Sequence, residues 1–102
     1  MNARTLYDFL EREIPSSLSE SWDNDGIMCC PDPAREVKKV LIALDITERV
    51  ADYAIAGGFD VIVSHHPMVF YKLGGIDPTL NTSRKLIKLI KNDLPAISFH
   101  TR

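Results

Sequence analysis

The chain has 102 residues, of which 45% are apolar and 25% charged, the balance of an ordinary globular protein of about one domain. Its net charge of -2 gives no general attraction to nucleic acid or to anionic lipid. No apolar run approaches the roughly 20 residues of a membrane-spanning helix, and the first residues lack the apolar core of a secretory signal. We therefore expect a cytoplasmic protein without membrane or nucleic-acid partners, whose adjacent Cys29 and Cys30 stay reduced.

The first third of the chain predicts one helix and one short strand. Apolar residues at helical spacing predict a helix over residues 3–13, which Pro15 ends because its ring and missing N–H do not fit an interior turn. After a polar stretch, residues 26–30 predict a short strand.

From residue 37 onward, strands and helices alternate. The continuous apolar run over 40–44 is typical of a strand buried on both faces, and the runs over 61–63 and 96–99 predict two more buried strands. Thr47 is the expected N-cap of the first intervening helix, which Gly57-Gly58 closes.

A further helix is expected after the loop over 68–80, with Thr82 or Ser83 as its cap and its apolar residues facing inward: Leu86, Ile87, Leu89 and Ile90. Strand, helix, strand, helix and strand with short connections predict an α/β fold with a parallel βαβαβ core and flanking helices. The order of the strands in the sheet cannot be deduced from this pattern.

Titratable side chains follow all three predicted parallel strands: Asp45, the pair His65-His66, and His100. Because the carboxyl ends of parallel strands meet at one edge of a sheet, where ligands bind in open α/β folds, these residues predict a site. Neutral imidazole is a common ligand of Zn, Fe, Mn and Ni, and two adjacent imidazoles are costly to bury unless they are paired or ligated.

Other interpretations stay open at this point. Asp45 can simply cap the following helix, and the two histidines can form a hydrogen-bonded pair without a metal. If they are ligands, adjacent side chains should splay apart and suit two ions better than one. Such a centre also needs carboxylates, for which the chain offers Asp45 and, less plausibly, Asp60 or Asp77.

Four motifs stand in order along the chain: Trp22-Asp23-Asn24-Asp25-Gly26, Leu44-Asp45-Ile46-Thr47, Ser64-His65-His66-Pro67-Met68-Val69-Phe70 and Ser98-Phe99-His100-Thr101. In type and spacing they resemble the YbgI-like dinuclear metal-centre proteins, also called the Nif-three-like family and often named type-two GTP cyclohydrolase I. The resemblance implies that residues 1–102 are one α/β domain, the N-terminal portion of a longer fold. Arg102 is also what a trypsin-like cut would leave, so a truncated chain is expected.

The resemblance implies a centre of two divalent ions, Zn, Fe, Mn or Ni, to which His65 and His66 supply one ligand each. His100 is implied to lie beside the ions as a catalytic proton carrier, and a bridging aspartate would follow Arg102. Other residues are implied to border the pocket: Asp45, Trp22, Asp25 and Lys72. For Trp22 itself the default expectation is a packing role.

The resemblance also implies a homo-oligomer, a hexamer in the family, that acts on a small molecule such as a nucleotide. One hypothesis is a metal-dependent hydrolase, in which the ions activate a water for attack on an electrophilic centre, as in GTP cyclohydrolase chemistry. The alternative is a non-catalytic metal-binding module for regulation or protein interaction. The glycine pairs at 57–58 and 74–75 lack phosphate-loop spacing. For residues 1–102 alone we expect weak metal affinity and no catalysis.

Overall fold

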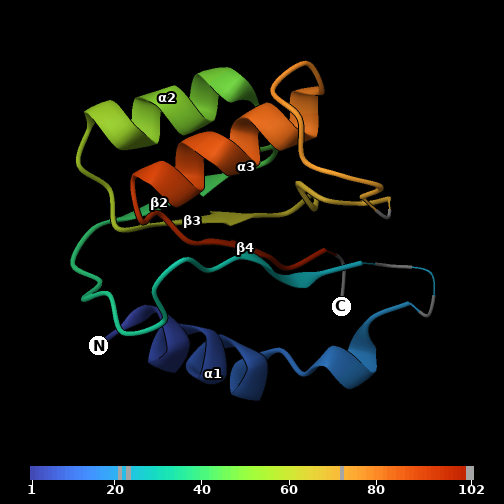
Figure 1. Ribbon diagram of the computed structural model, residues 1–102. Coiled ribbons are helices and arrows are strands. Elements are labelled where there is room, and N and C mark those ends of the chain that lie inside the picture. The colour runs from blue at the N-terminus through green and yellow to red at the C-terminus, as the bar shows by residue number, and fades with distance from the viewer. Residues whose placement is uncertain (21, 23, 72, 101–102) are drawn as a thin grey trace.

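The computed structural model describes residues 1–20, 22, 24–71 and 73–100 (Figure 1). Its elements in chain order are α1 (Ala3–Glu13), the 3-10 helix η1 (Ser16–Leu18), β1 (Gly26–Cys29), β2 (Val40–Ala43), α2 (Glu48–Ala56), β3 (Val61–Ser64), α3 (Asn81–Lys91) and β4 (Ala96–Ser98). The strands form one sheet, with α2 and α3 on one side and α1 on the other (Figure 1). None of the helices in these described ranges has the length and apolar character needed to cross a membrane.

The sheet confirms the predicted parallel core and adds an antiparallel edge. Its strand order is β1-β4-β3-β2, and β2, β3 and β4 run parallel. Ala43 pairs with Ser64, and Ser64 in turn pairs with Ser98, so the carboxyl ends of these strands lie level. β1 pairs antiparallel with β4, starting at Gly26 opposite Ser98. The segment before β1 therefore reaches the same edge of the sheet as the ends of the parallel strands.

The prediction that the strand over 40–44 is buried on both faces is wrong. Val40, Ile42 and Leu44 are 40%, 79% and 62% exposed. The reason is that β2 is the last strand of the described sheet, and only one of its faces, the one carrying Leu41, packs against the core. A continuous apolar run is typical of a central strand, and it does not distinguish such a strand from a half-covered edge.

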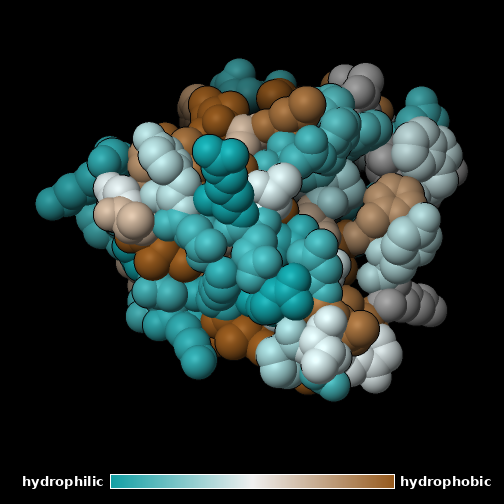
Figure 2. Space-filling model, turned by 90° about the horizontal axis from the view of Figure 1, so that it is seen from above, coloured by the Kyte–Doolittle hydropathy of each residue, from teal (hydrophilic) through white to brown (hydrophobic). Residues whose placement is uncertain are grey.

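The core lies between the sheet and the pair α2 and α3. Ile62 of β3 packs there with Leu86 and Leu89 of α3 and with two alanines of α2, Ala51 and Ala54. Seen from above this helical layer, most of the surface is hydrophilic, with apolar side chains gathered mainly toward its margins (Figure 2).

The predicted caps are right for α2 and wrong for α3. Thr47 caps α2, its Oγ1 accepting from the Val50 amide at 3.1 Å, and Gly58 follows the helix at φ +69°, a region that glycine adopts without strain. α3 starts earlier than predicted, with Leu80 at the N-cap and no side-chain cap. Ser83 consequently lies in the first turn and faces the interior, where it is fully buried. Ile90, predicted to face inward, is largely exposed near the end of the same helix.

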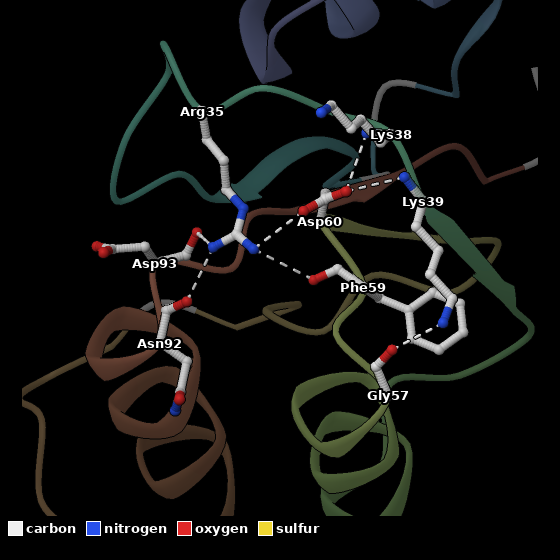
Figure 3. A network of polar contacts seen from close by, with 8 residues as sticks. All are labelled: Arg35, Lys38, Lys39, Gly57, Phe59, Asp60, Asn92 and Asp93. Atoms are coloured by element: carbon white, nitrogen blue, oxygen red, sulfur yellow. Dashed lines mark hydrogen bonds and ion pairs between the residues drawn. The ribbon is translucent and has the colours of Figure 1, made fainter.

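A polar network ties the helix ends to the segment before β2 (Figure 3). The Arg35 guanidinium donates to the carbonyls of Asn92 and Asp93 at the end of α3, at 3.1 and 2.9 Å. It also donates to Asp60 Oδ1 at 3.1 Å. A cation is favourable at the C-terminus of a helix, where carbonyls lack intrahelical partners. The network fixes the amino end of the parallel sheet, opposite to the edge with the histidines.

Candidate metal centre

The ends of the parallel strands bring the histidines together. The hydrogen-bond ladder between β2 and β3 continues past both strands, because the His65 and His66 amides donate to the carbonyls of Ala43 and Leu44 at 3.2 and 2.9 Å. The Phe99 amide donates to the Ser64 carbonyl at 2.9 Å, which carries β4 along β3 in the same way. The turns after β3 and β4 therefore lie side by side.

Three half-buried imidazoles converge at this edge. His65, His66 and His100 each offer a ring nitrogen, and the three nitrogens all lie within 4.8 Å of one another. The ring centroids of His65 and His66 are 4.9 Å apart, and those of His65 and His100 are 4.7 Å apart. The expectation that the adjacent histidines splay apart is therefore wrong: both rings turn toward His100. Three ring nitrogens at this spacing could hold a metal ion.

Two buried serines hold the backbone of the histidine pair. Ser64 Oγ donates to the His66 carbonyl at 2.8 Å, and Ser98 Oγ donates to the His65 carbonyl at 3.3 Å. Both serines are buried at the ends of neighbouring strands. Their hydroxyls satisfy carbonyls that the end of the sheet would otherwise leave without a ladder partner. This role was not predicted, although the sequence carries a signal for it, since a small polar residue ends each of two adjacent apolar strands.

Asp45 contacts the cluster and does not cap α2. Its Oδ1 lies 2.7 Å from His66 Nδ1, with side chains 54% and 44% exposed respectively. The cap of α2 is Thr47, so the alternative role for Asp45 is excluded. The other carboxylates named as candidates lie in separate networks, since Asp60 pairs with Arg35 and Asp77 accepts from the amide and hydroxyl of Thr79.

The segment before β1 reaches the cluster from the other side. The Trp22 ring meets that of His100 edge-on at 6.0 Å between centroids, and Trp22 is 62% exposed, so within the described residues its ring packs against the histidine cluster and not in the core. Asn24 Nδ2 donates to the Val69 carbonyl, which ties this segment to the loop after the histidine pair. Asp25 accepts from Ser19 Oγ at 3.1 Å within its own segment. Lys72, a predicted pocket residue, lies outside the described residues.

Comparison with known proteins gives matches over nearly the whole chain. The family model described as Duf34/NIF3 (NGG1p interacting factor 3) matches residues 1–102. A Clostridium perfringens relative named GTP cyclohydrolase 1 type 2 homolog is 38% identical over 101 residues, which cover 99% of this chain and 38% of the relative.

Solved structures agree with this match. The crystal structure of Staphylococcus aureus protein SA1388 superimposes with a TM-score of 0.91 at 37% identity, covering 99% of this chain and 28% of that one. A structure of protein ybgI, of unknown function, gives a TM-score of 0.77 at 20% identity, covers 98% of this chain and 39% of its own, and shows the shared fold alone. The chain spans less than two-fifths of the length of these relatives.

Proposed function

Because the chain belongs to the Duf34/NIF3 family, we propose that its histidine cluster binds divalent metal ions and forms part of a metal-dependent hydrolase of the type-two GTP cyclohydrolase kind. The observation that most supports metal binding is the convergence of His65, His66 and His100, whose ring nitrogens lie within 4.8 Å of one another. The support for hydrolysis is the name of the Clostridium perfringens relative, GTP cyclohydrolase 1 type 2 homolog.

The donor set fits a borderline transition metal. Imidazoles suit Zn, Fe and Ni, and the carbonyls of His65 and His66 are held by buried serines, so the ligands are positioned before an ion arrives. Divalent ions in this place would supply a water of lowered pKa and a Lewis acid toward the substrate. The chain's own contribution would be orientation of the ligands, with His100, whose ring lies against that of Trp22, as the third ligand instead of the proton carrier that the resemblance implies.

A centre of two ions, as the resemblance implies, needs carboxylates in addition to these imidazoles. Paired ions about 3.5–4 Å apart are typically clamped by shared oxygen ligands. Among the described carboxylates, Asp45 is engaged by His66, and Asp60 and Asp77 belong to other networks. We therefore propose that residues 1–102 alone bind one ion weakly and turn over no substrate, and that the two-ion hydrolase, a cytoplasmic homo-oligomer, needs a protein of the relatives' full length.

Calorimetric titration of the metal-free chain with Zn²⁺ and Mn²⁺ tests the proposal. We expect about one ion per chain, and a loss of binding by tenfold or more in each of His65→Ala, His66→Ala and His100→Ala. Asp52→Ala is the matched control, because Asp52 is an exposed carboxylate whose partner is Lys88 on α3. Equal binding by wild type and a variant lacking all three histidines would refute the metal site. Turnover of GTP that is absent even from a metal-loaded protein of full family length would refute the hydrolase.

A further inference from the structure

The contact between Asp45 and His66 decides which ring nitrogen of this histidine is available. An ionised carboxylate only accepts hydrogen bonds, so the Nδ1 atom of a neutral His66, 2.7 Å from Asp45 Oδ1, must carry the ring proton. The lone pair is then on Nε2. A ligand histidine whose other nitrogen donates to a carboxylate is fixed in tautomer and ring orientation, and its basicity rises.

Backbone hydrogen bonds place Asp45 next to His66 independently of the contact between their side chains. The His66 amide donates to the carbonyl of Leu44, the residue just before Asp45, at 2.9 Å. Immediately after Asp45, the buried Ile46 anchors the chain and Thr47 caps α2. The aspartate therefore lies in the short connection between β2 and α2, at the level of the histidine in the neighbouring chain segment.

A cation from α3 supports this connection. Lys85 Nζ donates to the Ile46 carbonyl at 2.9 Å, reaching from α3 to the residue that follows Asp45. Burial lowers the pKa of Lys85, and the negative charges of Glu48 and Asp45 partly oppose that shift. His66 therefore contacts the aspartate itself, while Lys85 holds the backbone of the next residue.

We propose that Asp45 is a positioning residue that holds His66 in its Nδ1–H tautomer, so that Nε2 is the nitrogen offered to the cluster. Its bearing on metal affinity rests on the proposed function, whereas the tautomer itself is a property of the metal-free chain. The assignment also removes Asp45 from the carboxylates available to bridge two ions.

Long-range ¹H–¹⁵N spectra of the ¹⁵N-labelled, metal-free chain at about pH 8.5, where imidazoles are ordinarily neutral, read the tautomer directly. We expect His66 to be in the Nδ1–H form in wild type and to lose that preference in Asp45→Ala. Asp45→Asn keeps an acceptor oxygen without the charge, so it should retain part of the preference. Asp52→Ala, a similarly exposed carboxylate on α2, should leave the spectrum of His66 unchanged.

The metal arm of the experiment is Zn²⁺ titration of the same variants. Loss of such a supporting carboxylate typically costs about 10–100-fold in metal affinity, and we expect a decrease in this range for Asp45→Ala. A proton on Nε2 of His66 in wild type, or a tautomer that Asp45→Ala does not change, would overturn the inference. If wild type keeps the Nδ1–H form and binds no metal, the proposed function fails and the pairing stands.

Discussion

Replacing Asp60 should destabilise the fold more than any comparable surface change. Asp60 is only 19% exposed and accepts from the amides of Lys38 and Lys39 at 2.9 Å each and from Arg35 at 3.1 Å. Hydrogen bonds to a charged group contribute about 1.5–3 kcal/mol each when buried. Water can reach both lysine amides, so we expect Asp60→Ala to cost about 2–3 kcal/mol in total.

For a chain of this size that cost corresponds to a decrease in Tm of roughly 8–24 °C. The loss of unfolding free energy is measured by urea unfolding at pH 7, followed by far-UV circular dichroism, with Asp52→Ala as the control. Asp52 is exposed and paired only across the surface to Lys88, so its loss should change the free energy of unfolding little. An Asp60→Ala chain that unfolds within about 0.5 kcal/mol of wild type would refute the reasoning, since that is the range of ordinary surface substitutions.

The same carboxylate gives the prediction a pH dependence. The hydrogen bond from the Lys38 amide, with those from Arg35 and Lys39, lowers the pKa of Asp60 below its ordinary value of 3.8. A depressed pKa in the folded state means that the stabilisation is complete above the unfolded value and is lost as the pH falls through the folded value. The stability difference between wild type and Asp60→Asn should therefore be constant at neutral pH and shrink below about pH 4.

Two further predictions concern the site and the thiols. Ser98→Ala removes the donor to the partly buried His65 carbonyl, so it should lower the free energy of unfolding in urea by about 1–2 kcal/mol and shift the ring resonances of His65. Unchanged resonances would contradict the role of that serine. Burial raises the pKa of Cys29 to about 11 and also raises the pKa of Cys30, so iodoacetamide at pH 7.5 should label the folded chain slowly, Cys29 slowest, and label both in urea, as intact-mass measurements would show. Fast labelling of Cys29 in the folded chain would mean that β1 opens.

The parts of the fold that the sequence predicted are those set by local chemistry. α1 has the predicted bounds because Pro15 ends it, and α2 follows Thr47 and closes before Gly58, as its cap residues require. The three parallel strands were predicted by apolar runs of the right length, and the family resemblance is confirmed by the match over residues 1–102. The bounds of these helices and the presence of the strands do not depend on the order of the strands in the sheet.

The errors arise where tertiary position decides. Ile42 is exposed because β2 is at the edge of the sheet, which a run of apolar letters cannot indicate. Ser83 was a plausible cap, but α3 starts at Asn81, so Ser83 lies on the inward face of the first turn and is buried. At the site, the shared strand edge correctly predicted that His65-His66 and His100 meet, whereas the serine hydrogen bonds depend on strand register and could not be predicted without it.

The apolar side chains of β2 also bear on how this protein behaves at high concentration. An edge strand of the described sheet that exposes Val40 and Ile42, followed by the exposed Leu44, is a template for pairing with another chain, the first step toward aggregation. Two lysines, Lys38 and Lys39, stand immediately before the strand, where flanking charges act as gatekeepers against such pairing. The Lys39 ammonium donates to the Gly57 carbonyl and lies over the Phe59 ring, so we expect Lys38 to contribute most of this protection. Solubility of the chain should therefore depend on the same short segment whose amides hold Asp60 in place.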